Sequence, residues 1–126
     1  MNVIDHAKQP IEEWRPGVTT RMRVSALTRA AQLTIFDQWC TAGLGAPTHL
    51  HEVEEVLSVI EGEAQIWVED DSTTVKAGQS VVIPAGSRHG FRNSGENLLH
   101  VQATLAAPVF EASYDDRSER SRRWEP

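Results

Sequence analysis

The stretch Thr48-His49-Leu50-His51-Glu52-Val53-Glu54-Glu55 decides how this chain folds and what it can bind. On a β-strand alternate side chains point to the same face, so His49 and His51 would lie about 6.5–7 Å apart on one side. Glu55 shares their parity and can join them if the chain bends only modestly between strands. Farther along, His89 opens another extended segment after a Pro-x-Gly turn and can lie opposite them on an adjacent strand. The sequence therefore predicts a cluster of three imidazoles and one carboxylate.

Outward from this stretch, the chain is a series of short extended runs separated by turns rich in glycine, proline and aspartate. We expect strands at residues 18–25, 32–40, 48–52, 55–60, 64–69, 73–76, 80–84, 88–93 and 98–105. About nine short strands at this spacing favour an all-β sandwich or barrel. An α/β fold would need helical patterns of about 10–15 residues between the strands, and the sequence lacks them.

Length and composition narrow the class of protein. The 126 residues predict one domain spanning 1–126, with no room for separate cofactor and substrate domains. Eighteen acidic residues against twelve basic ones give a net charge of −6, which argues against a nucleic-acid partner. The single cysteine, Cys40, excludes an intramolecular disulfide framework, and no apolar run is long enough to span a membrane. We therefore expect a soluble cytoplasmic protein with no membrane partner.

The C-terminal segment, about residues 111–126, differs from the rest in its density of charge. Apart from Tyr114 and Trp124 it has little to bury, so the favoured interpretation is a solvated or frayed terminus. The alternative is a docking arm that places Trp124 against a neighbouring subunit.

The donor atoms of the predicted cluster indicate the kind of ion it would hold. Three imidazoles and a carboxylate suit one divalent transition metal (Fe, Mn, Ni, Zn, Co or Cu) and are poorly suited to Ca or Mg. Four protein ligands leave two positions open on an octahedral metal, which water or a bidentate substrate can occupy.

Two glycine-containing motifs surround these residues. Gly43, His49, His51, Glu55 and Gly62 fit the pattern G-x5-H-x-H-x3-E-x6-G. A second set fits G-x5-P-x-G-x2-H-x3-N after an inter-motif stretch of 15 residues, and it comprises Gly78, Pro84, Gly86, His89 and Asn93. With both motifs complete over residues 43–93, the chain resembles the cupin superfamily of RmlC-like proteins.

This resemblance implies a small single-domain cupin with an antiparallel jelly-roll β-barrel of six to nine strands, often a homodimer. Carried over residue by residue, it implies that His49, His51, Glu55 and His89 are metal ligands. It also implies that Glu55, rather than Glu52 or Glu54, is the carboxylate ligand. Dioxygenases, isomerases and lyases all occur among such proteins.

Further residues are candidates for a substrate pocket beside the metal. Phe91 shares the parity of His89, and Gln38 and Gln102 are polar residues on expected strands. Arg21 or Arg23 can pair with a substrate carboxylate through a bidentate guanidinium, unless both lie on the outer face of an early strand. On 98–105 we expect the apolar set from Leu99 to Leu105 to face the barrel, which leaves His100 outside the pocket.

The sequence thus leads to two main functional hypotheses. In the first, the protein is a metal-dependent enzyme for a small oxygenated molecule, with Glu55 as a possible proton shuttle. In the second, it binds or senses a small molecule or metal without turnover. A structural dimer with a vestigial site is a third and less favoured hypothesis, since all four ligands are present.

Overall fold

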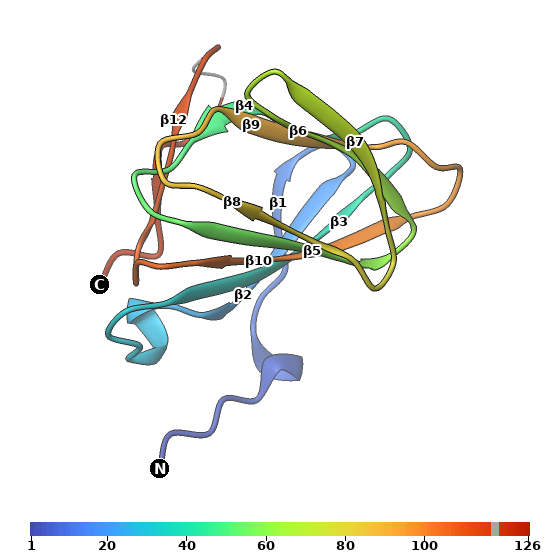
Figure 1. The fold of residues 1–126 in the computed structure, drawn as a ribbon. Coiled ribbons are helices and arrows are strands. Elements are labelled where there is room, and N and C mark those ends of the chain that lie inside the picture. Colours follow the sequence, from blue (N-terminus) through green and yellow to red (C-terminus); the bar gives the residue numbers. More distant parts are fainter. Residues whose placement is uncertain (117–118) are drawn as a thin grey trace.

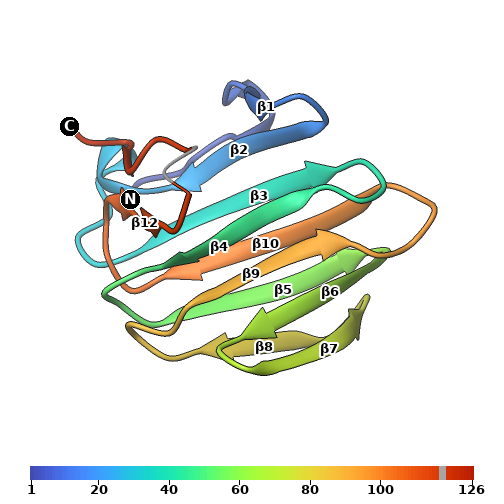
Figure 2. The ribbon, with the colours of Figure 1, turned by 90° about the horizontal axis from the view of Figure 1, so that it is seen from above.

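The computed structural model describes residues 1–116 and 119–126, and within these ranges the regular secondary structure is almost entirely β-strand. Two antiparallel sheets face each other (Figures 1 and 2). One has six strands in the order β1-β2-β3-β10-β5-β8, and the other has five in the order β12-β4-β9-β6-β7. Strands β11 and β13 form a small separate ribbon. This architecture is the predicted all-β jelly roll.

The strands of the six-stranded sheet are β1 (Glu12–Arg15), β2 (Val18–Val24), β3 (Thr34–Cys40), β5 (Glu55–Glu61), β8 (Ser80–Ile83) and β10 (Leu99–Leu105). Those of the five-stranded sheet are β4 (Gly45–Leu50), β6 (Glu63–Val68), β7 (Asp71–Lys76), β9 (His89–Asn93) and β12 (Ser113–Tyr114). The ribbon is formed by β11 (Phe110–Glu111) and β13 (Arg122–Arg123), and two 3-10 helices are η1 (His6–Lys8) and η2 (Ala26–Thr28). All nine predicted strands are present, with boundaries that differ by a few residues. No helix in the described ranges is long and apolar enough to cross a membrane.

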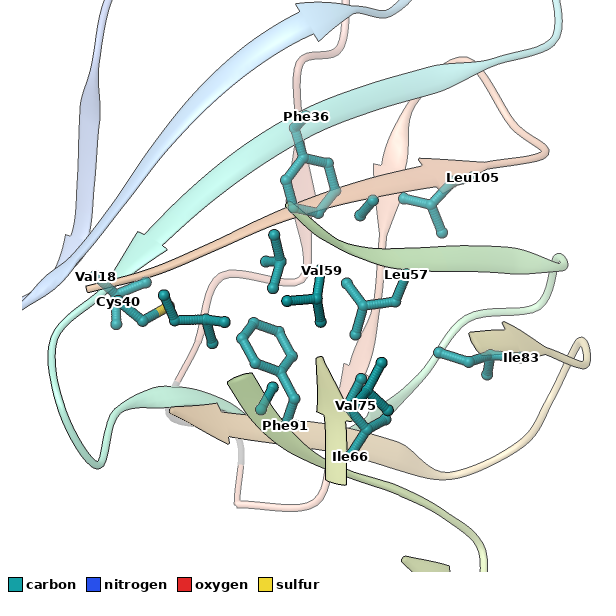
Figure 3. Close-up of a cluster of buried hydrophobic side chains, with 14 of the residues drawn as sticks. Val18, Phe36, Cys40, Leu57, Val59, Ile66, Val75, Ile83, Phe91 and Leu105 are labelled. Carbon is teal, nitrogen blue, oxygen red and sulfur yellow. The ribbon is translucent and has the colours of Figure 1, made fainter. Parts of the chain in front are cut away.

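The hydrophobic core fills the space between the two sheets (Figure 3). Phe36, Leu57 and Val59 come from the six-stranded sheet and meet Ile66 and Phe91 from the five-stranded sheet. All five side chains are at most 5% exposed. Burial of this apolar surface, at roughly 25 cal/mol per Å², is the main force that holds the sheets together.

Strand β10 shows the alternation that the sequence predicts. Leu99, Val101, Ala103 and Leu105 are at most 1% exposed, whereas His100 and Gln102 between them are only half-buried. The apolar set therefore faces the core, as expected, and His100 lies on the outer side of the sheet.

Tight turns at the motif positions hold the strands in register. Gly62, between β5 and β6, has a φ of +85°, and a Cβ there would approach the Leu98 carbonyl oxygen to 3.0 Å. A residue with a side chain would be strained in this conformation. Asn93 closes a turn, as predicted: its side chain donates to the Cys40 and Asn97 carbonyls and accepts from the Gly95 amide.

Most described residues of the C-terminal segment are exposed, as the solvated interpretation predicts, but these residues are not frayed. Strand β12 pairs with β4, with Tyr114 opposite His49. Ala112 is 4% exposed. The expectation of fraying counted charges within the segment, whereas apolar surface elsewhere in the barrel determines where its few apolar residues pack.

Trp124 docks, but against its own chain. Its ring centroid lies 5.7 Å from that of Trp14 and 5.3 Å from that of Phe36. Its indole Nε1 donates a hydrogen bond of 2.8 Å to Glu12. The contacts of Trp124 that the structure shows are therefore intramolecular, with residues of β1 and β3.

Candidate metal centre

Four side chains from three strands and one loop converge inside the barrel. His49 lies in β4, His51 directly follows that strand, and Glu55 and His89 are the first residues of β5 and β9. Their exposed fractions are 6, 2, 4 and 2%, respectively. One ligand atom from each lies within 4.8 Å of the others. The structure thus brings together the four residues that the sequence singled out.

Strand pairing explains the convergence. Strands β4 and β9 are antiparallel neighbours, and their register places His49 opposite His89. The backbone after β4 is tied down by the Gly86 amide, which donates to the His51 carbonyl over 2.8 Å. Because Gly86 also belongs to the turn before His89, this bond joins the two halves of the cluster.

Backbone carbonyls orient all three imidazoles. The Nδ1 atoms of His49, His51 and His89 lie 2.7, 2.7 and 2.8 Å from the carbonyl oxygens of Pro47, Glu111 and Ser87, respectively. A carbonyl can only accept, so each Nδ1 carries a proton and donates it. In a neutral ring the Nε2 atom then keeps a free lone pair. The arrangement is the outer-shell support typical of metal-binding histidines.

Several inward-pointing atoms have unused hydrogen-bonding capacity. His51 Nε2, His89 Nε2 and Glu55 Oε1 are buried, and none makes a well-formed hydrogen bond within the described ranges. His89 Nε2 and His51 Nε2 lie 2.8 and 3.7 Å from Glu55 Oε1. Buried polar atoms are costly unless they are paired. A cation at the centre of these atoms would satisfy all of them, so the residues fit a metal ion.

The electrostatic environment favours the ligand forms of three of these groups. Burial lowers the pKa of His49 to about 4, and burial also lowers the pKa of His51, so both rings are neutral near pH 7. Burial alone would raise the pKa of Glu55, but the His89 and His51 rings outweigh it, and the pKa is lowered. Burial opposes protonation of His89, but the adjacent Glu55 carboxylate raises its pKa. Neutral imidazoles and an ionised carboxylate are the forms that bind metals.

The cluster opens onto a small cavity. Its volume is about 20 Å³, which is room for roughly one water molecule. Gln38 and Phe91, two of the expected pocket residues, line it. Their side chains point inward because they alternate with outward-facing neighbours on β3 and β9.

The other three expected pocket residues lie outside this cavity: Arg21, Arg23 and Gln102. The prediction that they line the pocket is therefore wrong. Strand β2 turns Thr20 inward, where it accepts a hydrogen bond from Gln38, and alternation turns Arg21 to the outer face. The outward Arg23 and Gln102 side chains both bond Asp37.

Sequence reasoning missed several residues that line the cavity, among them Trp14, Arg15 and Tyr114. The Tyr114 ring stacks on His49 with centroids 5.0 Å apart. Trp14 and Arg15 are consecutive, and consecutive residues of a regular strand face opposite sides. A register shift between Glu13 and Arg15 allows both to face inward. Nothing in the short, charged run Glu12–Arg15 signals such a bulge.

A comparison of the sequence with protein families finds one match: the family model described as "Cupin domain" matches residues 41–104. No curated protein matches the sequence.

Solved structures with the same fold are numerous and distant in sequence. An RmlC-like cupin from Shewanella frigidimarina is 22% identical, with 86% of this chain and 95% of that chain covered and a TM-score of 0.71. The polyketide cyclase RemF from Streptomyces resistomycificus is 18% identical, with 91% and 85% covered and a TM-score of 0.75. The oxalate decarboxylase of Lactobacillus farciminis is 17% identical, with a TM-score of 0.79, and this chain (88% covered) corresponds to 35% of it. At such identities the similarity establishes the fold alone.

Proposed function

The chain belongs to the cupin family, and on that premise we propose that it is a metal-dependent enzyme acting on a small oxygenated molecule. The proposed ligands are His49, His51, Glu55 and His89. The proposed chemistry is of the dioxygenase, isomerase or lyase type. A hydroxy acid, a diketone or a uronate would present the adjacent oxygens that such a centre accepts.

One observation carries the proposal. Three imidazole rings are each fixed by an Nδ1 bond to a backbone carbonyl, so that their Nε2 atoms converge on Glu55. A core stabilised only by packing has no reason to gather four polar groups and leave inner atoms of three of them, His51, Glu55 and His89, unpaired. The geometry is therefore better explained by ligand binding than by stability.

The protein side chains have distinct parts in the proposed reaction. A divalent transition metal, when bound, polarises a coordinated oxygen and can lower the pKa of a bound water. Gln38, Phe91 and the neighbouring aromatic residues limit the size of the substrate and exclude bulk water. Glu55 is the one carboxylate that lines the cavity, and it can accept a proton from a substrate held there.

The first test is elemental analysis of protein purified without added metal, followed by oxygen-uptake and turnover assays with 2-hydroxy acids, 1,3-diketones and uronates. Stoichiometric iron with oxygen uptake would support a dioxygenase. Zinc, nickel or manganese with turnover but without oxygen uptake would support an isomerase or a lyase. A protein that takes up no metal even after reconstitution would contradict the ligand assignment.

Replacement of Glu55 separates catalysis from binding. We expect Glu55→Gln to reduce turnover about 100-fold or more while a substantial part of the metal is retained, because three histidines remain and the proton acceptor is lost. Parallel loss of metal and turnover would contradict the proton-transfer role. Metal and ligand binding without turnover in the unaltered protein would instead identify a binding or sensor protein.

A second copy of the chain is the protein partner that we propose, as a homodimer. Leu98 and Ile11 are 51% and 49% exposed, and they line a shallow apolar hollow with Trp39 on the outer side of the six-stranded sheet. Light scattering across a concentration series tests this, and a monomer at every concentration would contradict it.

A further inference from the structure

Arg15 is the one arginine or lysine among the cavity-lining residues that the structure describes. It is the last residue of β1, and the bulge in that strand turns it toward the cavity. No other expected arginine reaches this space, since Arg21 and Arg23 lie on the outer face. The guanidinium is therefore the cationic group that a substrate in the cavity can meet besides the metal centre.

The hydrogen-bonding capacity of Arg15 is only partly used. Its Nη1 atom forms an ion pair with Glu119, whose side chain is 6% exposed. Its Nη2 atom is buried and has no hydrogen-bond partner within residues 1–116 and 119–126. Guanidinium normally binds a carboxylate through two parallel N–H groups. The pairing with Glu119 thus leaves a buried donor for a further acceptor.

Glu119 lies between two cationic groups. Besides Arg15, it approaches Arg123, with 3.7 Å between Glu119 Oε2 and Arg123 Nη2. The Arg123 guanidinium is itself 3.7 Å from the centroid of the Trp14 ring. Burial lowers the pKa of Arg15, and the nearby Asp116 carboxylate acts in the opposite direction. The rim of the cavity is therefore an anion site that a carboxylate of the chain already occupies.

The charge of the loaded site indicates what can replace Glu119. A divalent ion with the Glu55 carboxylate carries one net positive charge, and Arg15 adds another. An anion at the rim is therefore stabilised by both, in a site of low dielectric constant where such interactions are strong. If a neutral diketone displaced Glu119, the positive charge of Arg15 would be left without that ion-pair partner.

A substrate larger than water requires the cavity to widen. The volume of about 20 Å³ holds roughly a single water, so lining residues have to move for a larger molecule. Tyr114, which lines the cavity beside His49, belongs to strand β12, and this strand is only two residues long. Tyr114 is therefore a lining residue that little backbone pairing holds in place.

We propose that the substrate carries a carboxylate that Arg15 binds, and that Glu119 occupies this position until the substrate displaces it. The proposal rests on the metal-dependent function above and narrows its substrate class to acids, in place of neutral diketones. Arg15 is then a residue that determines specificity, and Glu119 is an internal competitor.

The test compares ligands that differ only in a second carboxylate. Lactate offers a 2-hydroxy acid to the metal, whereas malate and 2-hydroxyglutarate add a carboxylate at two distances. Binding to metal-loaded full-length protein is followed by calorimetry and by tryptophan fluorescence, since Trp14 lines the cavity. We expect at least one of the two diacids to bind about tenfold or more tightly than lactate, as a charge-assisted pair predicts.

Variants assign this preference to residues. Arg15→Gln is expected to abolish the preference for a diacid over lactate while metal content and lactate binding remain, and Arg15→Lys is expected to retain part of it. Glu119→Gln is expected to strengthen diacid binding several-fold, because the competitor is gone. Arg92→Gln and Glu125→Gln, at exposed positions away from the cavity, are the matched controls and are expected to behave like the unaltered protein.

The outcomes separate this proposal from the proposed function. A diacid preference that survives in both Arg15 variants, or its absence in the unaltered protein and in Glu119→Gln alike, would overturn the proposal while metal and lactate binding still supported the enzyme. The same titrations on metal-free protein test the opposite case. If the protein takes up no metal but still prefers a diacid in an Arg15-dependent way, the metal centre is contradicted and the anion site is supported.

Discussion

Two buried carboxylates lie on opposite faces of the same sheet, and each lies beside at least one histidine. Glu55 faces the cavity from β5 and is 4% exposed, while Asp37 faces outward from β3 and is 1% exposed. Asp37 accepts hydrogen bonds from Arg23 Nε, His100 Nε2 and Gln102 Nε2, at 2.7, 3.0 and 3.0 Å. Both of its oxygens have partners, whereas the groups around Glu55 leave their inner atoms unpaired.

This difference distinguishes a stabilising cluster from a binding cluster. Around Asp37 the partners are donors, so charge and hydrogen bonds are balanced within the protein itself. Around Glu55 the three imidazoles donate Nδ1–H groups to backbone carbonyls, and the neutral His49 and His51 rings present acceptor nitrogens toward a carboxylate. Acceptors facing acceptors in a buried space are stabilised by a cation. Composition alone does not separate the two clusters, because each contains an acid and at least one histidine.

The largest expected effect is on metal affinity, and it distinguishes a histidine of the Glu55 cluster from the histidine beside Asp37. His51→Ala should reduce metal affinity by at least about 100-fold, since a ligand is lost and not merely its support. His100→Ala, on the outer face, is the matched control and should retain the metal content of the unaltered protein. Elemental analysis after dialysis measures both. Equal metal content in the two variants would remove the distinction between the clusters.

The second effect is on stability, and here the outer cluster around Asp37 is the one that is sensitive to substitution. Asp37→Asn should lower the free energy of unfolding by about 2–3 kcal/mol, because it breaks a buried ion pair and leaves the donors of Arg23 and His100 poorly satisfied. Metal content should not change. Urea denaturation of metal-free protein provides the measurement, and a change below about 0.5 kcal/mol would show that the outer cluster contributes little to stability.

The smallest effect is on how the stability loss in Asp37→Asn depends on pH. Burial alone would raise the pKa of Asp37, but hydrogen bonds from Arg23, His100 and Gln102 outweigh it and lower the pKa. A carboxyl group whose pKa is lowered by folding stabilises the protein above its unfolded pKa of about 3.9, and this contribution is lost as the pH falls through the folded value. The difference between the unaltered protein and Asp37→Asn should therefore be full near pH 6 and shrink below about pH 4. A difference that grew on acidification would have the wrong sign.

The metal cluster could be predicted partly from local spacing and partly from the resemblance to a family. The alternation of His49 and His51 lies within one extended segment, whereas the pairing of β9 with β4 that places His89 opposite His49 is long-range. Spacing alone gives the first pair, and the two motifs add Glu55 and His89.

The face of β10 was likewise predictable from spacing, since every second residue from Leu99 to Leu105 is apolar. In β2 the apolar residues Val18, Met22 and Val24 share one face, so alternation already favours the outer face for Arg21 and Arg23, and their place in the expected pocket rested only on the chemistry of guanidinium.

Other parts of the site depend on features that leave no periodic signal. Arg15 faces the cavity because of a bulge, which breaks the alternation that strand prediction uses. Trp124 is held by Trp14 and Phe36, whose rings come close only once the barrel has formed. Long-range packing of this kind is set by the whole fold.

The hydrogen bond from His51 Nδ1 to the Glu111 carbonyl has a consequence for the biosynthesis of the protein. A ribosome releases all four proposed ligands before it releases Glu111, so the nascent chain has the metal-binding side chains without the carbonyl that orients one of them. Until β11 is in place, the His51 ring is free to turn either nitrogen toward an ion. The oriented form of His51 is therefore available only on a chain that has folded past Glu111.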